Sequence, residues 1–194
     1  GLPVFGDIEL FAWHAARETV IAVTGTNGKT TVTALVGHLL RSAGMDCEVA
    51  GNIAPPVLQA YEKRLLSGKA PRAWVLELSS YQLETTWSLE PEAAAMLNVS
   101  EDHLDRYAGI DEYAAAKARI FIGQGVQVLN RDNWRSLGMG QPNRRRLTFG
   151  LDAPASEEDF GVVNGVLQEG SHGFARAADL PIHGAHNVSN ALAA

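Results

Sequence analysis

The sequence contains one cysteine, no long apolar run and fewer basic than acidic side chains, and each shortage excludes a class of protein. Cys47 alone excludes an internal disulfide and a cysteine-rich metal site, and it is typical of a reducing compartment. No apolar run approaches the roughly 18 residues that a membrane-spanning helix needs, and the opening GLPVFGDIELFAW lacks the basic region of a signal peptide. The net charge of −6, from 16 basic and 22 acidic side chains, excludes a general attraction to nucleic acid or an anionic membrane.

What is present is an ordinary globular composition. The 194 residues are 46% hydrophobic and 20% charged, which is enough for one domain with its own core and without disulfides. We therefore expect a soluble, monomeric, cytoplasmic domain that binds neither nucleic acid nor membrane. The chain starts at Gly1 rather than Met and stops about two helical turns into NVSNALAA, so we expect a domain cut from a longer chain. A naturally ragged end is the alternative.

Strand-like and helix-like segments alternate over the first 130 residues. Apolar spacing predicts helices at about 32–40, 57–66 and 111–122, and short β-branched or apolar runs predict strands at 19–24, 46–50, 73–78, 93–99 and 125–130. This alternation predicts an α/β fold with a mostly parallel sheet and helices on both faces. The stretch 145–182 instead has short alternating runs divided by Gly and Pro, which predict a small C-terminal antiparallel β-hairpin region.

The motif GTNGKTT (25–31) follows a predicted strand and opens a predicted helix, as a phosphate-binding loop does. Its glycines permit a tight turn whose N–H groups face phosphate oxygens, and the helix N-terminus adds partial positive charge. Lys29 would contact the β- and γ-phosphates, and the Thr30 hydroxyl would bind Mg²⁺. The usual loop has a glycine where Val23 stands, so the motif is the shorter GxxGK[ST]. The alternative is a solvated turn with an incidental lysine.

Polar residues follow the predicted third strand, AWVLEL. Parallel strands end at one edge of a sheet, where ligands bind, so Glu77 is expected beside the phosphate loop as a second Mg²⁺ ligand. An edge-exposed glutamate is the alternative. Ser79 and Gln82 are placed to hydrogen-bond a substrate, although ordinary turn residues would look the same.

Three histidines are candidate metal ligands. His103 lies among Glu101, Asp102 and Asp105 after the fourth strand, where a neutral imidazole can bind metal while an acid fixes its other nitrogen; a structural histidine is the alternative. His183 and His186 have a suitable spacing, but no further ligands are near in sequence. We therefore interpret them as part of a loop and a helix start.

Lys117 lies within the apolar stripe of the predicted helix 111–122, which Tyr113, Ala116, Ile120 and Phe121 mark. Two interpretations are open. The side chain extends to solvent along the apolar surface, or it is buried near the ligand as a functional lysine with a lowered pKa.

Six motifs occur in an order known from one enzyme family. GTNGKTT, the GNI turn, LELSSYQLE, LNVSEDHLDRY, YAAAKARI and HGAHNVSNALAA follow one another as in the Mur ligases, which the chain resembles over essentially all its residues. Val23 before the phosphate loop is that family's own form. The pairing of LELSSYQLE with NVSEDHLDRY, together with GLPVFGDIELF, is similar to the members that add D-glutamate to UDP-N-acetylmuramoyl-L-alanine in peptidoglycan synthesis. Alternatives are another family member, such as a diamino-acid ligase or folyl-polyglutamate synthetase, and a nucleotide-binding module without ligase chemistry.

The resemblance implies an ATP-dependent ligase of three domains. Residues 1–194 would be its central ATP-binding domain, with 1–18 as a lead-in segment and 145–182 as the β-hairpin subregion. The uridine-binding and amino-acid-binding domains would lie outside this chain. The isolated domain is then expected to bind Mg·ATP weakly without ligating anything.

The resemblance also implies roles for individual residues. Thr30 and Glu77 would hold one Mg²⁺, and His103 would hold a second together with Lys117, carbamylated by CO₂. Lys29, His103 and Lys117 would be catalytic. Further roles would be phosphate binding by Gly25, Thr26, Asn27, Gly28, Lys29, Thr30 and Thr31, adenine-side contacts by Asn187 and Asn190, and substrate contacts by Asn52, Ser79 and Gln82.

Overall fold

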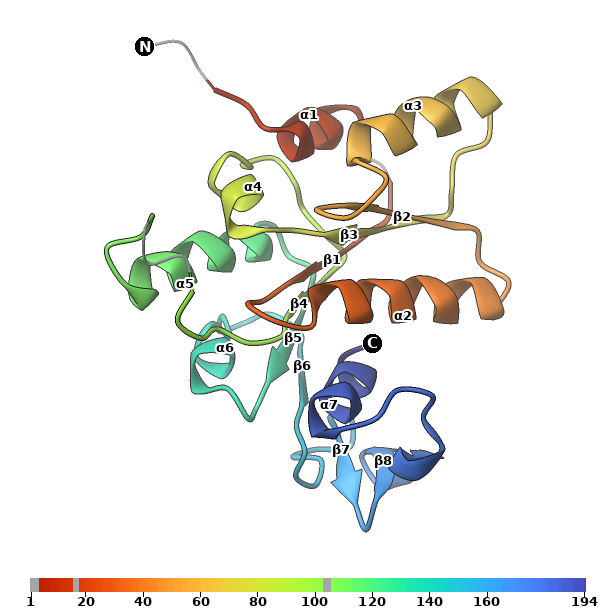
Figure 1. Cartoon of the computed structure of the whole chain (residues 1–194), viewed down its shortest axis with the longest axis vertical. Helices are drawn as coiled ribbons and strands as arrows, with labels where there is room; N and C mark the ends of the chain where they lie inside the picture. Colours follow the sequence, from red (N-terminus) through yellow and green to blue (C-terminus); the bar gives the residue numbers. More distant parts are fainter. Residues whose placement is uncertain (1–3, 16–17, 103–105) are drawn as a thin grey trace.

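The computed structural model describes residues 4–15, 18–102 and 106–194. Within these ranges nine strands form one sheet in the order β2-β3-β1-β4-β5-β6-β7-β8-β9 (Figure 1). The strands are β1 (Val20–Thr24), β2 (Cys47–Gly51), β3 (Ala73–Glu77), β4 (Ala93–Met96), β5 (Val126–Asn130), β6 (Arg146–Phe149), β7 (Phe160–Val163), β8 (Val166–Glu169) and β9 (His172–Arg176).

The strands from β2 to β6 are parallel to their neighbours, and β7, β8 and β9 are antiparallel to one another. The predicted fold class is therefore confirmed. One detail was wrong, because the run RLTF was expected within the hairpins but forms β6, parallel to β5. The connection between them contains α6 (Trp134–Gly138), whose five residues are too few to show a helical period in the sequence.

Helices cover both faces of the sheet, with α4 and α5 on one side of the strands and α2 on the other (Figure 1). Apolar residues of one core cluster come from α1 (Asp7–His14), α3 (Val57–Ser67), α4 (Ser80–Glu84), α5 (Ile110–Ala118) and η1 (Arg119–Phe121). The other cluster includes α2 (Lys29–Ser42), α7 (Ala185–Ala193) and the strands β7 to β9, with η2 (Ala177–Asp179) before α7. Adjacent β1 residues Ala22 and Val23 belong to different clusters, as the alternation of a strand requires.

The lead-in segment 1–18 contains α1, whose Ile8 and Phe11 are fully buried in the first core cluster. The β7–β8 turn is Asn164–Gly165, with φ of 51° and 75°, which is the backbone that a two-residue hairpin prefers. No helix in the described part of the chain has the length and apolar character to cross a bilayer.

Candidate nucleotide-binding site

The phosphate loop lies where β1 ends at Thr24 and α2 begins at Lys29. Gly28, the N-cap of α2, has a φ of 87°, and a Cβ there would lie 2.4 Å from Asn190 Oδ1, so glycine is required. The first intrahelical hydrogen bond runs from Val32 N–H to Gly28 O at 3.0 Å. Earlier N–H groups of α2 therefore point out of its positive end, which is the arrangement that binds phosphate.

Two lysines meet at one carbonyl oxygen of this loop. Lys29 Nζ donates to Gly25 O at 3.0 Å and to Thr26 O at 2.9 Å, and Lys117 Nζ donates to Gly25 O at 2.9 Å. The Lys117 side chain is 1% exposed, so extension to solvent was the wrong interpretation. Burial, and then the nearby Lys29 charge, lower the pKa of Lys117 to about 7. A fraction of Lys117 is therefore a neutral amine near neutral pH.

Glu77 ends β3 and is 2% exposed, which contradicts the edge-exposed alternative. Its Oε2 accepts a hydrogen bond from Thr30 Oγ1 at 2.7 Å, and its Oε1 accepts one from Asn52 Nδ2 at 2.9 Å. Asn52 follows β2, and its backbone N–H donates to Glu77 O at 2.8 Å. The start of α2 and the ends of β2 and β3 thus bring together Thr30, Asn52 and Glu77.

The donor set at this point fits Mg²⁺. The Thr30 hydroxyl and the Glu77 carboxylate are hard oxygen ligands, which Mg²⁺ prefers. Among the described residues no group of three or more His, Cys, Asp or Glu side chains is arranged to hold a metal. Mg²⁺ is usually bound by one or two protein oxygens together with substrate phosphates and water, so a two-ligand site is sufficient.

Ser79 and Gln82 form the capping box of α4. Gln82 N–H donates to Ser79 Oγ at 3.3 Å, and Ser79 N–H donates to Gln82 Oε1 at 3.2 Å. Gln82 Nε2 also donates to the Asp7 carboxylate on α1. These contacts explain both residue types structurally, so their substrate contacts stay a prediction.

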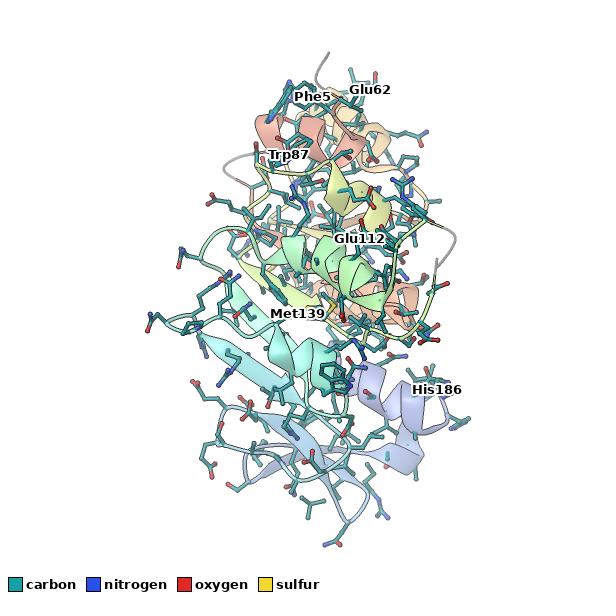
Figure 2. The ribbon with its side chains drawn as sticks, turned by 90° about the vertical axis from the view of Figure 1, so that its left-hand side faces the viewer. Phe5, Glu62, Trp87, Glu112, Met139 and His186 are labelled. Carbon is teal, nitrogen blue, oxygen red and sulfur yellow. The ribbon has the colours of Figure 1, made fainter. Side chains whose placement is uncertain are left out.

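Helix α7 brings Asn190 to the phosphate loop from a distant part of the sequence, and Asn187 contacts Asn190. Asn190 lies against Gly28 and donates from Nδ2 to Asn187 Oδ1 at 3.2 Å, and Asn187 Nδ2 donates to His183 O at 2.9 Å. Apart from the family resemblance, no signal in the sequence identifies this contact. His183, in the loop before α7, and His186, in its first turn, are exposed, as expected. Figure 2 shows His186 at the surface.

Two residues that follow β4, His103 and Asn98, also bear on this site. His103 lies outside the described residues, so its predicted metal role stays a prediction. Asn98, after β4, was not predicted as a site residue. Its side-chain amide hydrogen-bonds both the N–H and the C=O of Asn27 in the phosphate loop. The only indication in the sequence was its place at the end of a strand.

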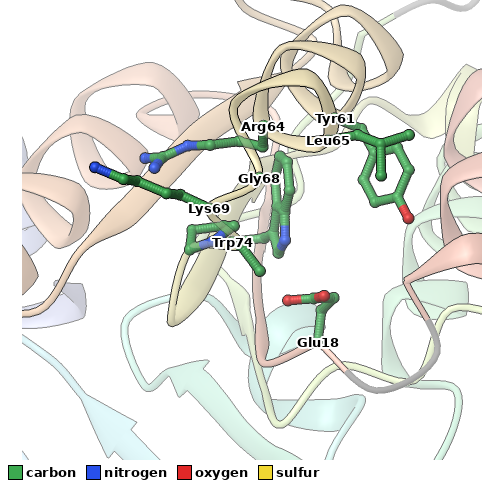
Figure 3. Close-up of a pocket in the computed structure, with 9 residues that line it drawn as sticks. Glu18, Tyr61, Arg64, Leu65, Gly68, Lys69 and Trp74 are labelled. Atoms are coloured by element: carbon green, nitrogen blue, oxygen red, sulfur yellow. The ribbon is translucent and has the colours of Figure 1, made fainter.

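A cavity of about 250 Å³ lies elsewhere, near the amino end of β3 (Figure 3). Glu18, Tyr61, Lys69 and Trp74 line it, and none of the predicted site residues does. Trp74 is the second residue of β3, whereas Glu77 is the last. The cavity is therefore separate from the edge where the phosphate loop lies.

The strand–loop–helix arrangement, the loop lysine and the Thr30–Glu77 pair are those of a phosphate-loop domain of the α/β class. Comparison with known proteins gives the family. Residues 23–194 match the Mur ligase middle domain, and the chain belongs to the Mur ligase family.

Two similar curated proteins carry the same name. The chain is 52% identical to a UDP-N-acetylmuramoylalanine–D-glutamate ligase of Nitrosomonas europaea, and 53% identical to one of Nitrosospira multiformis. Both alignments cover 100% of this chain but 44% and 43% of the relatives, so the chain spans less than half their length. Among solved structures, a pseudomurein peptide ligase type C from Methanothermus fervidus superposes with a TM-score of 0.69 at 19% identity, covering 96% of this chain and 47% of that one. This last likeness concerns the fold.

Proposed function

We propose that this domain binds Mg·ATP at the carboxyl edge of its sheet. The observation that carries the proposal is the convergence of Lys29, Lys117 and the Thr30–Glu77–Asn52 contacts on one loop. The N–H groups at the start of α2 and the Lys29 ammonium would hold the phosphates, and Thr30 and Glu77 would hold Mg²⁺. Bound Mg²⁺ would offset negative charge on the phosphates during transfer. Asn187 and Asn190 on α7 would lie on the adenine side.

We further propose that Lys117 carries a carbamate and, with His103, holds a second Mg²⁺. A neutral amine adds to CO₂ by forming an N–C bond and releasing one proton, and the product is an anionic oxygen ligand. Burial of Lys117 with a pKa of about 7 supports the first step, because part of the side chain is already neutral. The Gly25 carbonyl and the Tyr113 ring, 4.6 Å from Lys117 Nζ, orient the amine.

For the longer protein we propose ATP-dependent addition of D-glutamate to UDP-N-acetylmuramoyl-L-alanine. The alanyl carboxylate would attack the γ-phosphate, giving an acyl phosphate and ADP. The amine of D-glutamate would then attack the acyl carbon, and phosphate would leave. The 52% and 53% identities to ligases of that name support this choice within the family.

This chain would be the central of three domains, between a uridine-binding and an amino-acid-binding domain that lie outside it. Asn52, Ser79 and Gln82 would contact the muramoyl-alanine portion. The longer protein would be a cytoplasmic monomer, and the single cysteine Cys47 is typical of such a reducing compartment.

The test is an amino-acid specificity assay on the longer protein. With ATP, Mg²⁺ and UDP-N-acetylmuramoyl-L-alanine, we expect ADP release to depend on D-glutamate and not on L-lysine or diaminopimelate. Lys117→Ala is expected to abolish it. Turnover with a diamino acid in place of D-glutamate would contradict the assigned substrate, and full activity of Lys117→Ala would contradict the role of that lysine.

A further inference from the structure

We infer that Asn98 is a positioning residue of the nucleotide site, which fixes the phosphate loop and selects the N–H groups that face the ligand. The inference rests on the nucleotide binding proposed above. Strand β4 neighbours β1 in the sheet, and Met96 pairs with Thr24 at its end. The two residues after Met96 therefore bring Asn98 directly beside the loop that follows β1.

The Asn98 side-chain amide both accepts from and donates to the backbone of Asn27, as the backbone of a neighbouring strand would. Asn27 N–H donates to Asn98 Oδ1 at 2.9 Å, and Asn98 Nδ2 donates to Asn27 O at 3.0 Å. The backbone of Asn98 adds a third bond, because its C=O accepts from Thr26 N–H at 2.9 Å. Rotation of the side chain would break both hydrogen bonds, so Asn98 holds the peptide groups on both sides of Asn27.

These bonds divide the N–H groups of the loop into two sets. Those of Thr26 and Asn27 face Asn98 and are already hydrogen-bonded. Those of Lys29, Thr30 and Thr31 precede the first intrahelical bond of α2 and point out of its N-terminus. Phosphate contacts are therefore expected from the start of α2, while Thr26 and Asn27 serve as the support.

The segment 98–100, which holds the phosphate loop, is hydrogen-bonded on two sides. Ser100 N–H donates to Thr26 Oγ1 at 3.1 Å, which adds another bond between the two loops. On the other side, Val99 N–H donates to Asn133 Oδ1 at 3.2 Å, and Asn133 caps α6 by accepting from Ser136 N–H at 3.0 Å. The segment 98–100 thus connects the phosphate loop to the end of β5.

The position needs both a donor and an acceptor. Asn98→Leu keeps the shape but removes both side-chain bonds to Asn27. Asn98→Asp keeps an acceptor for Asn27 N–H, but it places a carboxylate oxygen against Asn27 O and adds negative charge beside an anion site. We therefore expect Asp to weaken nucleotide binding more than Leu does.

The first experiment is calorimetric titration of the 194-residue chain with Mg·ATP. We expect Asn98→Leu to bind about tenfold more weakly than the unaltered chain, and Asn98→Asp more weakly still. The matched control is Gln127→Leu. Gln127 is a buried amide near the start of β5 that holds backbone groups of Met139 and Gln141. The variant Gln127→Leu also replaces a side-chain amide with an apolar group, but away from the phosphate loop. Its affinity for Mg·ATP should therefore equal that of the unaltered chain.

The second measurement is hydrogen exchange of backbone amides. A general loss of stability would raise the exchange rate throughout the chain, whereas loss of a local hydrogen bond raises it at that bond. In Asn98→Leu we expect faster exchange at Asn27, whose N–H loses its side-chain acceptor. Exchange at Thr26, whose N–H bonds the backbone carbonyl of residue 98, and in β4 should match that in Gln127→Leu. Equal Mg·ATP affinity of Asn98→Leu and the unaltered chain, or unchanged exchange at Asn27, would overturn the inference. An unaltered chain that binds no Mg·ATP would refute the proposed function instead, and hydrogen exchange would still decide whether Asn98 holds the loop. Asn98→Ala replaces the leucine variant where that variant does not fold.

Discussion

The edge of the sheet that carries the phosphate loop and the β7–β9 unit bury polar groups in opposite ways. At the edge, the Lys117 ammonium is buried beside Lys29, and its pKa is lowered to about 7 because the fold disfavours its charge. Next to β7, the Asp159 carboxylate is buried with hydrogen bonds from Thr148 and Ser156, and its pKa lies below the ordinary value. The first arrangement costs stability at neutral pH, whereas the second contributes to it. The buried group that costs stability thus lies at the site that we propose binds nucleotide.

The strongest test of this contrast is Lys117→Met, which removes the buried charge and keeps most of the volume. The folded-state pKa of about 7 lies below the ordinary 10.5, so the unfolded chain binds more protons between these values. The penalty is therefore complete below pH 7 and absent above pH 10.5. We expect the variant to gain up to roughly 5 kcal/mol in unfolding free energy near pH 6.

This gain is measured by urea unfolding in CO₂-free buffer at several pH values. The stability difference between the two proteins should shrink steadily as the pH rises toward 10.5. A variant that is no more stable than the parent near neutral pH would show that the buried lysine costs nothing.

Leu167→Ala, in the β7–β9 unit, should lower the unfolding free energy and leave Mg·ATP affinity unchanged. Leu167 is 1% exposed and joins β8 to the core cluster that includes α7. Truncating it removes buried apolar surface and leaves a cavity, so we expect a loss of roughly 3 kcal/mol. Mg·ATP affinity, measured by calorimetry well below the melting temperature, should stay at the parent value. A large loss of affinity would mean that the two regions are not independent.

A smaller effect is expected from Asp159→Asn. Burial raises the pKa of Asp159, but hydrogen bonds from Thr148 and Ser156 and the Arg131 charge outweigh it, and the net shift is downward. The carboxylate therefore stabilises the fold above the ordinary pKa of 3.8, and this contribution is lost as the pH falls through the lower folded-state value. We expect the variant to lose about 1–2 kcal/mol at neutral pH. Acid titration of unfolding should show the two proteins converging below pH 3.8, and a constant difference would contradict the assignment.

The sequence predicted the parts of the molecule that local pattern determines. The strands from β1 to β5 and the helices α2, α3 and α5 follow from apolar spacing, and GTNGKTT follows from the chemistry of phosphate loops. Lys117 was identified because a lysine breaks an apolar stripe. Its burial then separated the two open interpretations.

The remaining features depend on contacts between distant segments. Helices α4 and α6, with five residues each, are too short to show a helical period, and β6 could not be distinguished from a hairpin strand without its partner. Asn98 and Asn190 reach the phosphate loop only through the sheet order and the packing of α7. An asparagine at the end of a strand carries no such information by itself.

The most direct test of the proposed nucleotide binding is calorimetric titration of this chain with ATP, with and without Mg²⁺. The variant Lys29→Met is titrated in parallel. Lys29 holds its ammonium at the phosphate loop through the Gly25 and Thr26 carbonyls, close to the start of α2, whose N–H groups would face the phosphates. We predict Mg²⁺-dependent binding that falls at least about a hundredfold in Lys29→Met, because the variant loses a charge-assisted contact. Absence of Mg²⁺-dependent binding, or equal binding by Lys29→Met, would contradict the proposal.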